Sequence, residues 1–129
     1  DFKEAAKWWR KAADQGYAEA QFYLGGMYLQ GQGVEQDFKE VMKWYRKAAD
    51  QGYAFAQLVL GGMYAKGLGV PEDNVTAYAW WNIAAANGNA DAKKGKPILA
   101  KKMTPDQISK AEELSKEMIK KNPKLIKKP

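Results

Sequence analysis

The sequence predicts an all-α solenoid, built from antiparallel helix-pair repeats of 36 residues and closed by a C-terminal capping helix. Residues 1–36 and 37–72 align without a gap and are identical at 25 of 36 positions. A decayed third copy begins at Asp73 and keeps the Asp, the paired Trp, the Ala-Ala and the Gly of the other two. A fixed period of this length indicates stacked supersecondary units rather than one globular core.

The repeats and the C-terminal residues after them form one predicted solenoid domain. Residues 104–122 are expected to form the capping helix, because the Gly-x-Gly-Val turn that ends the first two units is missing from the third. The predicted parts are repeat 1 (1–36), repeat 2 (37–72), a degenerate terminal repeat 3 (73–103), the capping helix (104–122) and a basic tail (123–129).

Each repeat is expected to begin with a helix, which we call helix A. The segment Asp37 to Glu40 matches a capping box, and Asp1 to Glu4 repeats it. Apolar residues then recur at steps of three and four, as on one face of an amphipathic helix. A glycine follows each stripe where a left-handed residue closes a helix. The predicted A helices span residues 2–14, 38–50 and 74–86, followed by Gly16, Gly52 and Gly88.

A second helix, helix B, is expected after each of these glycines. Gly25 and Gly61 lie inside its pattern, where each costs about 1 kcal/mol relative to alanine. A cost that recurs in register indicates close backbone approach. We expect a larger side chain at Gly61 to displace Trp44 or Tyr45, on helix A of the same repeat.

The third unit departs from this pattern. Pro97 lies inside its helix B and should kink or shorten that helix. Thr104 to Gln107 then reads as a new capping box with proline at the first helical position. The apolar stripe of this last helix is predicted to cover the third repeat and to leave charges facing water. The stripe consists of Ile108, Ala111, Leu114 or Ser115, Met118 and Ile119.

Composition limits the chemistry of the chain. It has no cysteine and no histidine, which removes thiolate chemistry and the commonest general base. No apolar run approaches the roughly 20 residues that span a bilayer. Because the chain opens on Asp1, already inside a repeat, we expect a mature form or fragment of a longer chain. Of the net charge of +6, much lies near the end, at Lys120, Lys121, Lys124, Lys127 and Lys128.

The repeated string resembles the Sel-one-like repeat family, which is related to the tetratricopeptide repeats. The match covers residues 1–72 fully, with Val41 in place of Ala5 in the second copy, and residues 73–92 in part. This resemblance implies a right-handed superhelix and a role as a bacterial protein-interaction scaffold. The motif residues in the first copy are Ala5, Trp8, Trp9, Lys11, Ala12, Ala13, Gln15, Gly16, Ala18, Ala20, Gln21, Leu24, Gly25, Tyr28, Gly31, Gly33 and Val34.

Three motifs have a structural and a functional interpretation. The Gly-x-Gly segments at 31–33 and 67–69 lack the strand and third glycine of phosphate loops, which favours inter-repeat turns. The paired tryptophans recur on the apolar face, which favours packing over stacking on bases or sugars. The lysine-rich end is either a solvated helix end or an electrostatic adaptor for nucleic acid or an anionic membrane.

We predict a scaffold that binds a protein or peptide partner, with no catalysis, no metal site and no cofactor. By analogy with tetratricopeptide arrays, the concave face takes recurring positions on the A helices. Lysine and arginine recur there in two successive repeats, which is either a solvated face or a ladder suited to an acidic or carboxylate-bearing peptide. Nucleic acid is not the expected partner, because no aromatic residues are interleaved with the C-terminal lysines to read bases. The compartment stays open between cytoplasm, periplasm and secretion. The predicted partner-binding residues are Lys3, Arg10, Lys39, Met42, Arg46, Tyr78 and Asn82.

Overall fold

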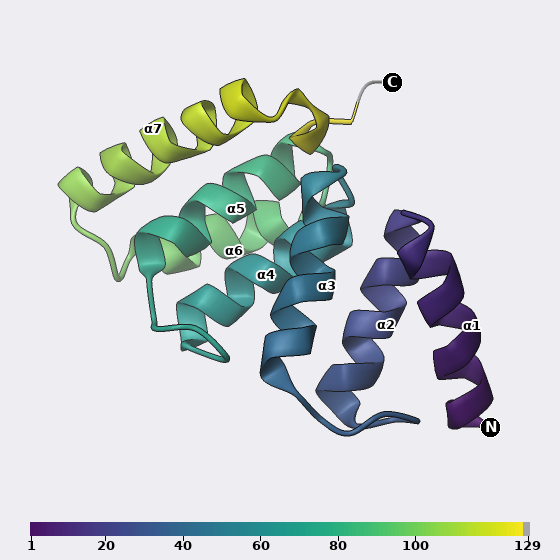
Figure 1. Cartoon of the computed structure of the whole chain (residues 1–129). Coiled ribbons are helices and arrows are strands. Elements are labelled where there is room, and N and C mark those ends of the chain that lie inside the picture. The colour runs from purple at the N-terminus through teal and green to yellow at the C-terminus, as the bar shows by residue number, and fades with distance from the viewer. Residues whose placement is uncertain (128–129) are drawn as a thin grey trace.

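The computed structural model describes residues 1–127, which form seven α-helices, one short 3-10 helix and no strand (Figure 1). This confirms the predicted all-α class, and the A helices have the predicted bounds. The elements are α1 (Phe2–Asp14), α2 (Ala18–Gln30), α3 (Phe38–Asp50), α4 (Ala54–Lys66), α5 (Asn74–Ala86), α6 (Ala90–Ala100), α7 (Pro105–Lys121) and η1 (Pro123–Leu125).

Aspartate begins each A helix, as the sequence indicates. The side chains of Asp1, Asp37 and Asp73 accept hydrogen bonds from backbone N–H groups of the first turn. The expected reciprocal half of the capping box is not made in α3. Glu40 Oε2 instead accepts from Trp44 Nε1 at 3.0 Å, because the indole lies one turn further along the same helix.

In the first two B helices, the recurring glycine packs against helix A of the next repeat. A Cβ atom added to Gly25 would stand 2.7 Å from the ring of Tyr45, and one added to Gly61 would stand 2.5 Å from Trp81. The expectation that Gly61 contacts Trp44 or Tyr45 is therefore wrong. The glycine in the sequence indicates that helix B approaches an A helix closely. Because the period places aromatic residues at equivalent positions on both neighbouring A helices, the sequence does not indicate which of the two it is.

Helix α6 continues past Pro97 for three residues. It has 11 residues where α2 and α4 have 13, so the helix is shortened but not ended by the proline. Leu99 and the following Met103 are buried with Ala77 and Ala111. The third unit thus keeps a helix pair although its motif has decayed.

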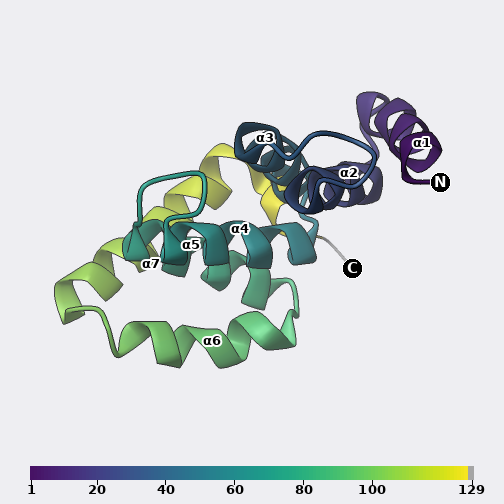
Figure 2. The same cartoon turned by 90° about the horizontal axis from the view of Figure 1, so that it is seen from below.

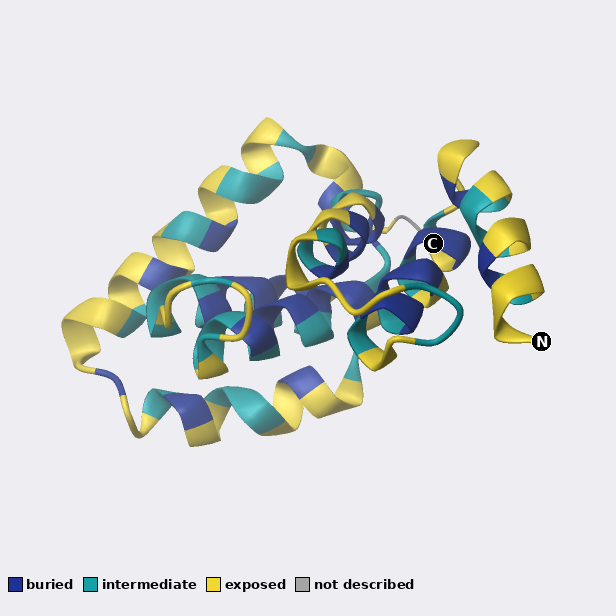
Figure 3. Ribbon diagram, turned by 60° about the horizontal axis from the view of Figure 1, so that its bottom comes forward, coloured by how far each residue is buried: buried dark blue, intermediate teal, exposed yellow. Residues whose placement is uncertain are grey.

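Helix α7 runs along α5, on the side away from α6 (Figures 1 and 2). The full capping box at Thr104 and Gln107 starts it, as predicted. Ala111 and Ser115 are its buried residues, and its outward face is exposed (Figure 3). The chain then turns through η1, whose Leu125 joins the core of repeats 2 and 3. Residues 123–127 of the expected tail are therefore packed against the solenoid.

Candidate functional site on the A-helix face

Two of the predicted binding residues, Lys3 and Arg10, line one pocket beside α1. The pocket has a volume of about 320 Å³. Lys7 is a third cation at its rim, and Leu24 and Val34 supply apolar surface. The side chains of Lys3 and Lys7 are exposed, whereas Arg10 is half-buried. The result is a small apolar depression surrounded by positive charge.

One lining residue of the pocket, Ala6, stands where repeat 2 has Met42. Met42 is half-buried and packs against both neighbouring core clusters, and its Cγ lies 3.5 Å from the position that a Cβ on Gly69 would take. In repeat 1, Ala6 and Gly33 both line the pocket, and the start of α1 lies directly against Gly33, where an added Cβ atom would overlap the Phe2 carbonyl. Met42, a predicted binding residue, is thus packed into the core of repeat 2, whereas its equivalent Ala6 lines an open pocket in repeat 1.

Arg10 is held in place by two aromatic side chains. Its Nη2 donates to the Tyr28 hydroxyl, and its guanidinium lies 5.6 Å from the ring centroid of Trp44. Arg46 repeats the stacking one unit later, 5.2 Å from the centroid of Trp80. These distances are in the range of cation–π attraction. Both arginines are therefore positioned by the tryptophan of the following repeat.

The two arginines differ in their acidic neighbours: within residues 1–127, Arg46 forms an ion pair and Arg10 forms none. Arg46 Nε donates to Asp50 Oδ1 at 3.1 Å, an exposed pair within one helix. Such a pair contributes little to stability, and Arg46 can exchange Asp50 for the carboxylate of a partner.

Lys39, another predicted binding residue, is exposed near the start of α3. Its backbone N–H donates to the capping side chain of Asp37.

The other two predicted residues, Tyr78 and Asn82, lie between α5 and α7. Asn82 Nδ2 donates to Ser115 Oγ at 3.4 Å. Tyr78 packs beside the cluster that contains Ala111, and burial, together with the charge of Glu112, raises its pKa. The chain's own last helix thus covers the A-helix face of repeat 3, and the open part of that face belongs to repeats 1 and 2.

Sequence reasoning missed part of this site. Lys7 recurs as Lys43, so a search for every recurring cation would have found it. The apolar floor was not predictable, because Leu24 and Val34 reach the pocket from α2 and from the loop after it. The stripe on α7 correctly predicted a cap, but a stripe does not say which neighbouring helix it covers.

The paired tryptophans mostly pack, as predicted. Trp80 is buried, and Trp81 Nε1 donates to the Leu58 carbonyl at 2.9 Å. Trp8 differs from them, because it is 64% exposed beside Lys11. The Gly-x-Gly segments form the expected turns between repeats.

Residues 1–127 contain neither a metal-binding cluster nor a membrane-spanning helix. Within that range no three His, Cys, Asp or Glu side chains are grouped so as to hold a metal ion. None of the helices in the same range combines the length and the apolar character needed to span a bilayer.

Comparisons with known proteins identify the family. The Sel1 repeat model matches residues 1–17, 18–53 and 54–89, so the chain belongs to the Sel1 repeat family. The second and third matched units, 18–53 and 54–89, each start at a B helix and end after the next A helix, which is the pair joined by the glycine contacts described above. No curated protein matches the chain.

Two solved structures support the same assignment. The chain is similar to c5321, a protective antigen of uropathogenic Escherichia coli that displays an SLR fold, with 44% identity and a TM-score of 0.89 over 95% of this chain. A Sel1 repeat protein from Oxalobacter formigenes is 38% identical, with a TM-score of 0.71 over 74% of this chain. The chain spans 27% of the first protein and 40% of the second.

Proposed function

We propose that this Sel1 repeat chain is a non-catalytic interaction module that binds an acidic protein segment at the pocket around Arg10. The observation that supports this is the pocket's composition: Lys3, Lys7 and Arg10 surround apolar surface, and within residues 1–127 no acidic side chain lines it. A partner segment with a carboxylate next to a small apolar side chain complements both features.

The pocket is suited to a carboxylate because Arg10 is already oriented. A guanidinium can hold a carboxylate by two parallel hydrogen bonds, whereas lysine offers a point charge. Contacts to Tyr28 and Trp44 limit the conformations of Arg10, so less side-chain entropy is lost on binding. Exposed Lys3 and Lys7 accelerate association with an acidic segment through long-range attraction. Lys39 and Arg46 extend the positive surface along the next repeat.

This function can be tested by selecting binding peptides from a random library displayed on phage and measuring their affinity for the wild type and for variants. We expect selected sequences to carry Asp or Glu beside an apolar residue. The variant Ala6→Met should reduce their affinity about tenfold or more, since it copies Met42 and fills the pocket without changing charge. Lys3→Glu with Lys7→Glu should reduce it further. Lys116→Glu, an exposed charge change on α7, is the matched control and should leave binding intact.

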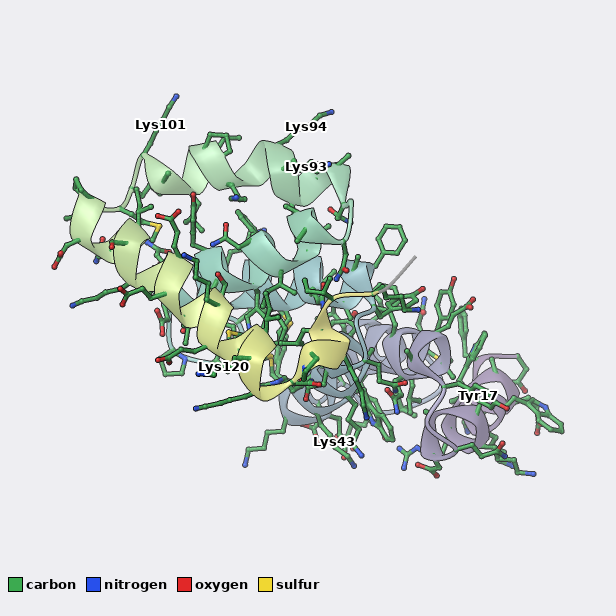
Figure 4. All side chains as sticks on the ribbon, turned by 90° about the horizontal axis from the view of Figure 1, so that it is seen from above. Tyr17, Lys43, Lys93, Lys94, Lys101 and Lys120 are labelled. Atoms are coloured by element: carbon green, nitrogen blue, oxygen red, sulfur yellow. The ribbon has the colours of Figure 1, made fainter. Side chains whose placement is uncertain are left out.

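A second candidate function is electrostatic adhesion through the lysine-rich end. Lys120, Lys121, Lys124 and Lys127 are all exposed, and Figure 4 shows Lys120 pointing away from the ribbon; Lys128 lies outside the described residues. Binding of this kind to DNA or anionic vesicles should weaken steeply with salt and should survive in Ala6→Met. If the selected peptides bind Ala6→Met as well as the wild type, the pocket is not the binding site.

A further inference from the structure

The C-terminal segment of this chain occupies a groove at the junction of repeats 2 and 3. Leu125 is buried there among Ala48, Ala49 and Ala56. Its carbonyl oxygen accepts from Gln57 Nε2 at 2.9 Å and from Asn87 Nδ2 at 2.8 Å. Two residues later, Lys127 N–H donates to Asn87 Oδ1 at 2.8 Å. The groove therefore holds the end of η1 and the two residues after it by one leucine and three main-chain hydrogen bonds.

The same amide arrangement recurs 36 residues earlier, at the junction of repeats 1 and 2. Gln57 Nε2 donates to the Ala49 carbonyl at 3.0 Å, and Gln21 Nε2 donates to the Ala13 carbonyl at 3.2 Å. At both junctions, a side-chain amide of the next repeat also donates to the Oε1 atom of this buried glutamine, Gln57 or Gln21. Asn87 Nδ2 reaches Gln57 Oε1 and Gln51 Nε2 reaches Gln21 Oε1, each at 2.9 Å.

Only the second of these two equivalent grooves is filled within residues 1–127. At Gly52, the Lys124 carbonyl oxygen lies 2.6 Å from the position of an added Cβ; at Gly16, apart from the glycine and its two chain neighbours, no atom of the described residues lies within 4 Å of that position. The space beside Gly16 is a cavity of about 620 Å³, with Trp9, Tyr17 and Tyr53 among its lining residues. The groove of repeat 1 thus has Gln21 and Gln51 at the positions of Gln57 and Asn87, is lined by aromatic side chains, and has Lys127 of the docked segment at its edge.

We propose that the groove beside Gly16 binds a short peptide segment supplied by another protein, with a leucine at the end of one 3-10 turn, as Leu125 has in η1. The leucine side chain enters between Ala12 and Ala20, which correspond to Ala48 and Ala56. Its carbonyl accepts the second N–H of Gln21, and the N–H two residues later donates to Gln51 Oε1. Neither group has another hydrogen-bond partner in residues 1–127.

The two grooves differ at one anchor. Gln51 is one methylene longer than Asn87, and its remaining Nε2 hydrogen already donates to the Gly16 carbonyl at 2.8 Å. The bound carbonyl in repeat 1 is therefore held by one amide rather than by two. This site lies at the ends of the helix pairs, shares no residue with the pocket around Arg10, and does not depend on the function proposed above.

The chain supplies its own probe, a synthetic peptide with the sequence of residues 122–127. Added to the whole protein, it competes poorly for the groove at Gly52, because the tethered segment has an effective concentration on the order of millimolar. Side-chain amide resonances measured by NMR report the two grooves separately. We expect the peptide to shift Gln21, Gln51 and the Gly16 N–H, while Gln57 and Asn87 stay unchanged.

Two changes test the chemistry of recognition. Replacing the leucine of the peptide by alanine should weaken binding about tenfold or more, since most of the buried apolar area is lost. Gln51→Met removes the Oε1 acceptor and should weaken the original peptide several-fold. Gln15→Met is the matched control, because Gln15 is an exposed residue near the same groove and does not line it.

Three results would overturn the proposal. The first is an absence of shifts at peptide concentrations of several millimolar. The second is a shift confined to Gln57 and Asn87, which would mean that the peptide only displaces the chain's own segment. The third is equal binding of the leucine and alanine peptides. The wild-type titration alone decides the first two, so the test does not depend on the stability of a variant.

Discussion

Repeats 1 and 2 share 25 of 36 residues, yet the same residue types have different surroundings in them. Trp8 is 64% exposed, whereas its equivalent Trp44 is 2% exposed. Trp44 packs in a cluster with Leu24 and Tyr28 from α2, and no helix within residues 1–127 stands in that position relative to Trp8. The environment of a repeat residue is therefore set by the neighbouring repeat as much as by its own, as expected for a one-dimensional array.

The tryptophans give the largest expected difference between the two repeats. Trp44→Ala should lower the free energy of unfolding by about 3–5 kcal/mol, because it leaves a cavity at the interface of repeats 1 and 2. Trp8→Ala should change it by about 0.5 kcal/mol or less, as is usual for exposed positions. Urea denaturation followed by circular dichroism measures both. Equal losses would mean that the exposure of Trp8 does not represent the protein in solution.

The docked C-terminal segment gives the next largest effect. Leu125→Ala should cost about 2–5 kcal/mol, since Leu125 is 2% exposed and is surrounded by residues from repeats 2 and 3. Ile126→Ala is the comparison, because Ile126 is only half-buried and should cost less. If Leu125→Ala is as mild as Ile126→Ala by thermal melting, the segment is not anchored through its leucine.

The paired glycines of helix B allow a sharper test of the contact between repeats. Gly61→Ala should destabilise the protein by about 1–3 kcal/mol, because its Cβ would stand 2.5 Å from Trp81. Gly62→Ala should stabilise it by up to about 1 kcal/mol, since beyond the adjacent residues and the local backbone of α4 no atom of the described residues lies within 4 Å of the added Cβ, and alanine favours the helix. Melting temperatures that move in the same direction for both variants would contradict the packing described.

The smallest expected effect is a dependence of stability on pH. Burial raises the pKa of Tyr45, and the pKa values of Tyr53 and Tyr78 are raised as well. Above the ordinary pKa of about 10, tyrosines ionise in the unfolded chain before they do in the folded one. The unfolded state then binds fewer protons, so stability falls as pH rises from about 10.

The variant Tyr45→Phe isolates this effect in repeat 2. Its unfolding free energy should decline less steeply with pH than that of the wild type, measured by urea denaturation at successive pH values. Repeat 1 has Trp9 at the equivalent position, which does not titrate, so the contribution belongs to repeat 2 alone. An unchanged slope would show that Tyr45 ionises as readily folded as unfolded.

Local signals in the chain are enough to predict the repeat, its helices and their ends. The period, the aspartate caps and the glycines after each A helix predict boundaries that the structure confirms, because these signals act within one or two turns of the chain. The same local logic predicted the capping box of α7 and the family. It also indicated that Arg10 and Arg46 lie at equivalent heights, since residues one period apart have equivalent positions.

The choice of neighbours depends instead on tertiary packing. The period repeats every residue, so it does not distinguish the A helix before Gly61 from the one after it. The apolar stripe of α7 fits any apolar surface, and its position over Tyr78 and Asn82 depends on how the chain turns after Met103. The open groove at Gly16 likewise depends on tertiary packing, because the C-terminal segment that covers Gly52 in repeat 2 has no counterpart at Gly16 within residues 1–127. These features depend on contacts between elements far apart in sequence, which local sequence patterns do not predict.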